Sequence, residues 1–200
     1  MGRNLKFNIF RYNPLDRSSV PHSDTFSVEE TDSMTLFIAL TRIREEQDPS
    51  IINGRPDLAC KTLTKELPTE ITLMPLPVFK LIGDLSVDTG TWFRGMNEKM
   101  GSWIHTDKTP DPNAEEEKMD NSLAEEIYEL ERCVECGCCV ASCGTANIRE
   151  DFVGAVALNR IARFMLDPRD QRKEREYFEV IGTDEGIFGC MGLLACEDVC

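Results

Sequence analysis

The stretch CVECGCCVASC, residues 133–143, decides how the second half of this chain folds. Four of its cysteines follow the spacing C-x2-C-x2-C-x3-C, and Cys138 is an additional fifth. A second run, CMGLLACEDVC, occupies residues 190–200 and repeats that spacing with one change. Leu193 stands where the second cysteine of the pattern is expected. The two runs therefore form a matched pair that lacks one thiol.

This spacing is typical of proteins that bind two iron–sulfur clusters. In such a run the first three thiolates bind one cluster, and the fourth cysteine binds the other cluster. The rule predicts a 4Fe–4S cluster held by three cysteines of the first run and the last cysteine of the second. These ligands are Cys133, Cys136, Cys139 and Cys200.

Three cysteines remain for the second cluster: Cys143, Cys190 and Cys196. Leu193 supplies no thiolate, so this site has one ligand fewer than a complete cubane requires. Three thiolates can hold a cubane that lacks one iron. The sequence therefore predicts a 3Fe–4S cluster here, and two neighbouring clusters indicate electron transfer.

A structural zinc site is the main alternative, because cysteine quartets with C-x2-C pairs also bind zinc. Zinc sites usually combine two separated pairs, whereas here three cysteines fall within seven residues and a fourth follows. The spacing favours iron–sulfur clusters. Cys138 has no place in the ligand pattern, and we interpret it as a small buried apolar residue.

The composition is that of a globular protein, with 41% hydrophobic and 29% charged residues among 200. A net charge of −14 disfavours binding to nucleic acid and to anionic membrane surfaces. Nine cysteines without a secretory signal at the N-terminus favour a reducing compartment. The longest apolar run, 34–40, is too short to span a bilayer, so we expect any membrane attachment to be made by a partner.

The first 90 residues carry the pattern of a small α+β domain. Alternating apolar residues predict strands around 5–9 and 26–28. A helix is predicted from an N-cap at Ser33 to about Glu46.

Further short strands are predicted at 58–63 and 71–74, after a hairpin turn at Asn53-Gly54. This order of elements predicts a β-grasp sheet wrapped on one helix. The segment 79–103 reads as a connector and helix leading out of that domain.

Residues 91–200 are predicted to form an all-α domain around the cysteines. A capping box at Ser122 opens a helix that leads to Cys133, and Asp151 is predicted to cap a second helix, which ends at Pro168. A short helix is expected around 177–181. The charged segment 106–121 reads as a solvated loop.

The whole chain resembles the iron–sulfur subunit of the fumarate reductase and succinate dehydrogenase family. The resemblance rests on the two cysteine runs, on NGRP at 53–56 with LAC at 58–60, and on DLSVD at 84–88. Cys143-Gly144-Thr145, where many relatives have Cys-Pro, is most similar to the menaquinol-linked fumarate reductases of bacteria.

The resemblance implies an N-terminal plant-type ferredoxin domain with a 2Fe–2S cluster, followed by a bacterial ferredoxin-like domain with 4Fe–4S and 3Fe–4S clusters. It also implies electron relay between a flavoprotein subunit with FAD, where fumarate and succinate interconvert, and a quinone site. That site would lie in a membrane-anchor subunit, with or without haem b, and the chain would be attached through this subunit to the cytoplasmic face of the inner membrane. The chain itself would be a non-catalytic subunit, and its two isolated histidines and scattered carboxylates mark no substrate site.

The sequence departs from the family at the 2Fe–2S site. The plant-type spacing is C-x4-C-x2-C followed later by a fourth cysteine. Cys60 matches the fourth ligand, but the other three ligands are absent from this sequence, as though a loop had been cut out between 51 and 52. Either this sequence lacks a segment that the natural protein has, or the protein has lost the first cluster of the relay. We favour the first alternative, because Cys60 and its hairpin are retained.

Two other functions fit the cysteines less well. An adaptor subunit of another redox complex, of the heterodisulfide or glycolate-oxidising type, usually has two complete four-cysteine motifs, and Leu193 speaks against it. A zinc scaffold that moves no electrons would be colourless, whereas an iron–sulfur protein is brown.

Overall fold

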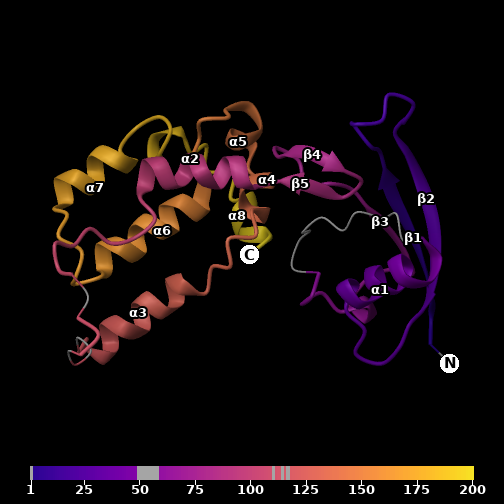
Figure 1. The fold of residues 1–200 in the computed structure, drawn as a ribbon, viewed down its shortest axis with the longest axis horizontal. Coiled ribbons are helices and arrows are strands. Elements are labelled where there is room, and N and C mark those ends of the chain that lie inside the picture. Colours follow the sequence, from indigo (N-terminus) through magenta and orange to yellow (C-terminus); the bar gives the residue numbers. More distant parts are fainter. Residues whose placement is uncertain (1, 49–58, 110, 114, 116–117) are drawn as a thin grey trace. The chain divides into compact units, whose positions relative to one another are not determined.

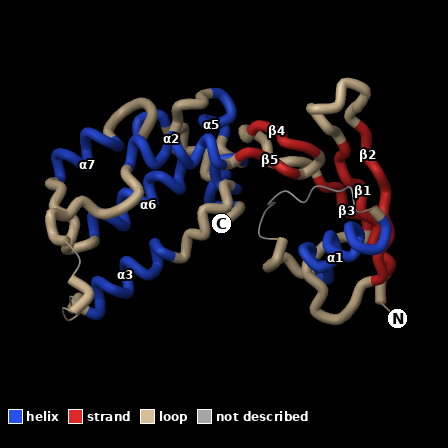
Figure 2. The backbone as a smooth tube through the Cα atoms, viewed as in Figure 1, coloured by secondary structure: helices blue, strands red, loops and turns tan. Residues whose placement is uncertain are grey.

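The computed structural model describes residues 2–48, 59–109, 111–113, 115 and 118–200. The chain divides into two compact units, Met1–Thr89 and Gly90–Cys200. The five strands found among the described residues all lie in the first unit (Figure 2). Among the described residues, no helix is both long enough and apolar enough to cross a bilayer.

The N-terminal unit is built on a three-stranded sheet in the order β2-β1-β3 (Figure 1). The central strand β1 (Asn4–Arg11) pairs antiparallel with β2 (His22–Glu29) and parallel with β3 (Glu70–Leu73). Three of its alternate side chains, Leu5, Phe7 and Ile9, are completely buried. The predicted strands at 5–9, 26–28 and 71–74 are confirmed, because their apolar alternation turns one face of the sheet to the core.

One helix covers that face. Helix α1 (Leu36–Arg42) continues as a π-helical turn, η1 (Ile43–Gln47), and Leu36, Ala39, Leu40 and Ile43 join the core of the sheet. The predicted extent of the helix is confirmed, but its N-cap is Thr35 rather than Ser33. Thr35 Oγ1 accepts a hydrogen bond from the Ile38 amide.

One strand prediction in this unit was wrong, and one hairpin was missed. The described part of the predicted strand 58–63 forms a turn at 59–61, and only Leu63 makes an isolated bridge, to Thr35. The segment 79–103 contains a hairpin that we did not predict, β4 (Lys80–Gly83) with β5 (Ser86–Asp88), before helix α2 (Gly90–Met100). The predicted turn at Asn53-Gly54 lies outside the described residues.

The C-terminal unit consists of helices joined by loops, without a strand among its described residues. Its longer helices are α3 (Asn121–Glu131), α6 (Gly154–Leu166) and α7 (Glu174–Ile181), together with α2 (Figure 1). Helix α6 carries the apolar face of the unit and packs against α2, α3, α4 and α7. The remaining helices are short: α4 (Cys138–Ala141), α5 (Gly144–Ile148) and α8 (Ala195–Asp198).

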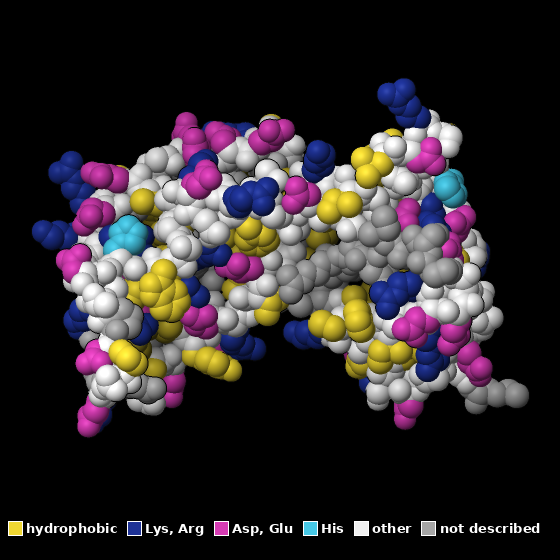
Figure 3. Space-filling view, viewed as in Figure 1, with side chains coloured by type: hydrophobic (Ala, Val, Ile, Leu, Met, Phe, Trp, Pro, Cys, Tyr) yellow, Lys and Arg dark blue, Asp and Glu magenta, His cyan; other side chains and the backbone are white. Residues whose placement is uncertain are grey.

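The predicted helices are confirmed, but two predicted caps were wrong. Asp120 caps α3, accepting from the Ser122 amide, so Ser122 lies inside the helix. Val153 precedes α6, and Asp151 instead pairs with Arg149. On the visible face of each unit, acidic and basic side chains are interspersed (Figure 3).

Candidate iron–sulfur sites

The cysteines of the C-terminal unit lie on short helices and on the loops between them. Cys133 and Cys136 lie in the loop after α3, Cys139 lies within α4, and Cys143 is the N-cap of α5. Cys190 follows the 3-10 turn η3 (Ile187–Gly189), and Cys196 lies within α8. Helix α4 contacts both α5 and α8, so the two distant cysteine runs are neighbours in the fold. All nine cysteines of the chain are thiols rather than disulfides.

The thiols of Cys133, Cys136, Cys139 and Cys200 lie close enough to influence one another electrostatically. Burial is the main cause that raises the pKa of Cys139 to about 11, and the neighbouring thiols Cys136, Cys133 and Cys200 add to it. The pKa of Cys133 is also raised, first by burial and then by the charges of Glu135, Cys136 and Cys200. A ligand thiol must lose its proton to bind iron, so a raised pKa makes metal uptake depend on pH.

Backbone amides donate hydrogen bonds to the cysteine sulfurs. The Glu135 amide donates to Cys133, and the Val156 amide donates to Cys139. The Gly192 amide donates to Cys190 Sγ over 3.4 Å. Such bonds favour the charged thiolate over the thiol, which opposes the effect of burial. At Cys133 and Cys139 these donors offset part of the effect of burial.

Two of the residues whose amides donate to cysteine sulfurs, Glu135 and Gly192, have a left-handed backbone conformation. Glu135 has φ 53°, and Gly137, immediately before α4, has φ 83°. In the second run, Gly192 has φ 64° and Leu194 has φ 58°. A residue with a Cβ pays roughly 1–2 kcal/mol for this conformation. Glu135 has a side chain that pairs with Arg160, whereas the side chain of Leu194 is exposed.

The thiols do not converge on a single point. Among the described residues, no group of three or more His, Cys, Asp or Glu side chains is placed to hold one metal ion. A zinc ion binds sulfur at about 2.3 Å and needs its ligands to meet at one centre. An arrangement of neighbouring thiols around a larger inorganic core does not have that requirement.

Two hydroxyl groups in or next to the first cysteine run donate hydrogen bonds to backbone carbonyls in or next to the second run. Thr145, only 2% exposed, donates its hydroxyl to the Gly189 carbonyl over 3.2 Å, next to Cys190. Ser142 donates to the Ala195 carbonyl over 3.2 Å, next to Cys196. Sequence reasoning missed both residues, because no spacing rule marks a hydroxyl that bridges two segments.

We expect Thr145→Val to weaken the connection between the two cysteine runs. Valine has the shape of threonine but cannot donate to the part-buried Gly189 carbonyl, and the loss of a typical hydrogen bond costs about 0.5–1.5 kcal/mol. The variant complex should unfold at a lower temperature and lose iron more readily. Thr145→Ser, which keeps the hydroxyl, is the matched control, and equal behaviour of the two variants would contradict the role of this bond.

Leu193 lies close to Gly144, the first residue of helix α5. Its Cδ1 is 2.8 Å from the place that a Cβ on Gly144 would occupy. Gly144 follows Cys143 directly, so the side chain at the position without a thiol reaches the neighbour of a predicted ligand. Only glycine at 144 leaves the leucine in this place.

Cys138 and Cys60 differ from the other cysteines. Cys138 is 5% exposed and lies beside Val140 and Ala141 in the buried part of α4, as expected of a small apolar residue. Cys60 is exposed in the turn at 59–61, and the sequence has no other cysteine in residues 1–89.

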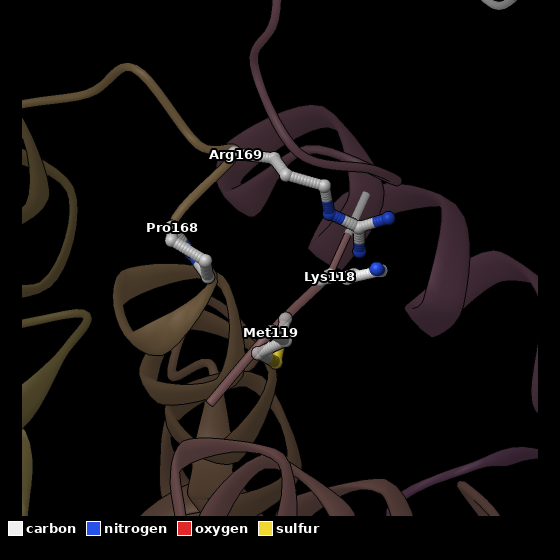
Figure 4. A pocket seen from close by; sticks show the side chains of 4 residues that line it. All are labelled: Lys118, Met119, Pro168 and Arg169. Carbon is white, nitrogen blue, oxygen red and sulfur yellow. The ribbon is translucent and has the colours of Figure 1, made fainter. Parts of the chain in front are cut away.

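The unit also has a pocket of about 390 Å³ that none of the cysteines lines (Figure 4). Its lining residues are Lys118, Met119, Pro168 and Arg169. Arg169 forms an ion pair with Asp167 at 2.6 Å. We assign this pocket no role in the electron-transfer site.

Residues 129–200 match a family described as a 4Fe-4S dicluster domain. The fumarate reductase iron–sulfur subunit of Wolinella succinogenes is 52% identical, in an alignment covering 100% of this chain and 91% of that protein. The alignment runs over 218 positions, whereas the chain has 200 residues.

The succinate dehydrogenase iron–sulfur subunit of Coxiella burnetii is 27% identical, over 98% of this chain and 89% of that protein. Among solved structures, a chain of the Mycobacterium smegmatis Sdh1 complex in the apo form matches with a TM-score of 0.76 and 22% identity. This match covers 100% of the present chain and 89% of the other, and it supports a shared fold.

Proposed function

The chain belongs to the family of iron–sulfur subunits of fumarate reductase and succinate dehydrogenase, and on that premise we propose which residues bind its clusters and which partners it joins. Proteins of this family are the electron-transfer components of oxidoreductase complexes. The chain is therefore an electron-transfer subunit that binds iron–sulfur clusters. The assignments below refine that function.

The first proposed site is a 4Fe–4S cluster bound by Cys133, Cys136, Cys139 and Cys200. The single observation that carries it is the proximity of these four thiols, because Cys136 and Cys200 lie close enough to act electrostatically on both Cys133 and Cys139. When bound, an iron–sulfur cluster accepts and releases an electron at a potential set by its charge, hydrogen bonds and exposure. The protein contributes amide donors to the sulfurs and a partly buried environment.

The second proposed site is a 3Fe–4S cluster bound by Cys143, Cys190 and Cys196, with Leu193 at the position without a ligand. The hydrogen bonds of Thr145 and Ser142 favour this grouping, because they join the segments that carry the three cysteines. The Gly192 amide supplies a donor to one of these sulfurs. Leu193 supplies an apolar side chain in place of a thiolate.

We further propose a division of labour between the two units. The N-terminal sheet with one helix on its face is consistent with a β-grasp, plant-type ferredoxin-like domain over 1–90, facing a flavoprotein subunit with FAD. The helical unit over 91–200 would be a bacterial ferredoxin-like domain facing a membrane-anchor subunit with a quinone site. Attachment to the cytoplasmic face of the inner membrane would then be made through that anchor.

The 2Fe–2S cluster is a separate question, because only Cys60 of its four ligands is present. The alignment with the Wolinella protein has 18 more positions than this chain has residues, so that relative carries residues that this chain lacks. This difference supports our proposal that a ligand-bearing segment is missing between 51 and 52. The natural subunit should then exceed 22.6 kDa by about 2 kDa in an intact-mass measurement. A mass of 22.6 kDa would show instead that the cluster has been lost.

Electron paramagnetic resonance on the purified complex tests the two proposed clusters. We expect a 3Fe–4S signal in the oxidised protein and a 4Fe–4S signal after reduction, in a brown sample. A colourless sample without iron or acid-labile sulfide would overturn the proposal in favour of a zinc-binding scaffold.

A further inference from the structure

Glu135 lies inside the cysteine run, between Cys133 and Cys136, and its backbone and side chain have different partners. Its φ of 53° is the left-handed conformation that glycine adopts most readily. In this conformation its amide donates a hydrogen bond to the Cys133 sulfur. The amide stays on the sulfur only while the backbone of Glu135 keeps this unfavourable turn.

The side chain of Glu135 is held by Arg160 from helix α6. Arg160 Nε lies 3.1 Å from Glu135 Oε1, and a second guanidinium nitrogen also donates to that oxygen. The third nitrogen donates to the side-chain oxygen of Asn97 on α2. The Arg160 side chain is only 11% exposed. One planar guanidinium therefore connects the cysteine run to two helices, which suits its fixed geometry.

We propose that Arg160 is a positioning residue for the 4Fe–4S cluster. It holds the side chain of Glu135 in place, and its positive charge offsets the negative charge of that carboxylate beside the ligand Cys133. This inference rests on the proposed function, because it needs that cluster to be bound. Nothing in the cysteine spacing marks Arg160, which follows Cys139 by 21 residues.

The sign of the electrostatic effect follows from the reaction. A cluster becomes more negative when it accepts an electron, so a nearby positive charge stabilises the reduced form and a nearby carboxylate destabilises it. The contribution of Arg160 is strengthened by its burial, whereas the partly exposed Glu135 is screened by water. Loss of Arg160 should therefore lower the reduction potential, and loss of the Glu135 charge should raise it.

Arg163 provides a matched control on the same helix. It lies three residues further along α6 and pairs with Glu131 at 2.8 Å, outside the cysteine run. Its side chain is also largely buried, at 22% exposed. Arg163→Gln removes a paired arginine of similar burial without touching the ligand loop.

The test is a redox titration of the 4Fe–4S cluster in the purified complex, followed by electron paramagnetic resonance. We expect Arg160→Gln to lower the equilibrium constant for reduction of the cluster about tenfold. For a one-electron couple this lowers the reduction potential by about 59 mV. Glu135→Gln, whose amide oxygen still accepts from Arg160, should shift the potential the opposite way. Arg160→Lys keeps the charge and should restore most of the potential, and Arg163→Gln should leave it unchanged.

Each outcome decides the question. If the unmodified complex contains the 4Fe–4S cluster but Arg160→Gln and Glu135→Gln both leave its potential unchanged, the charge role is overturned and the proposed function stands. If the unmodified complex lacks the cluster, the proposed function itself fails. If Arg160→Gln prevents cluster binding, Glu135→Gln still tests the charge role, because an unchanged or lowered potential in that variant would overturn it.

Discussion

Replacing Cys200 by alanine is expected to remove the 4Fe–4S cluster and to leave the 3Fe–4S cluster in place. The reason is the proposed crossing of ligands, in which the last cysteine of the second run completes the site of the first run. Changes to residues that only support a metal ligand cost about 10- to 100-fold in affinity or activity, so loss of a ligand should cost more. Electron transfer through the complex should fall by more than about 100-fold, and the signal of the reduced 4Fe–4S cluster should disappear.

Two variants complete this experiment. Cys190→Ala should remove the 3Fe–4S signal of the oxidised complex and spare the 4Fe–4S signal. Cys138→Ala changes a buried cysteine outside both ligand sets and should keep both signals, at a stability cost of about 1 kcal/mol. The crossing is wrong if Cys200→Ala removes the 3Fe–4S signal instead, because each run would then bind a cluster of its own.

Replacing Leu193 by cysteine is expected to convert the 3Fe–4S cluster into a 4Fe–4S cluster. The leucine side chain reaches Gly144, the neighbour of Cys143, so a thiol introduced here would lie close to the predicted ligand set. A fourth thiolate would supply the ligand that the missing iron requires. Cluster type is one of the main determinants of potential, so the converted cluster should have a different potential and electron transfer to the quinone site should slow.

The measurement is the paramagnetic signal of the oxidised complex, which only the 3Fe–4S cluster is expected to give. Leu193→Ala removes the side chain without adding a thiolate, so its complex should keep the signal. An undiminished signal in Leu193→Cys would mean that this position is not the vacant ligand position.

The predicted strands at 5–9 and 26–28 were confirmed because local alternation of apolar residues is enough to define a half-buried strand. Caps and short strands were predicted less well. Thr35, rather than Ser33, caps α1, and its backbone forms a bridge with Leu63, almost thirty positions further along the sequence. When the N-cap residue of a helix is determined by a contact with a residue far along the chain, the local sequence does not indicate it.

For the cysteines, the sequence alone determined the class of chemistry, since the spacing of thiols along the chain limits which metal centre they can surround. It also predicted which seven cysteines serve as ligands and which position lacks one. The tertiary structure decided what surrounds them: the amides of Glu135 and Val156 on the sulfurs, the hydroxyl of Thr145 on Gly189, and the guanidinium of Arg160 on Glu135. These contacts join residues far apart in the chain, because helix packing brings them together and no local pattern encodes which side chains will meet.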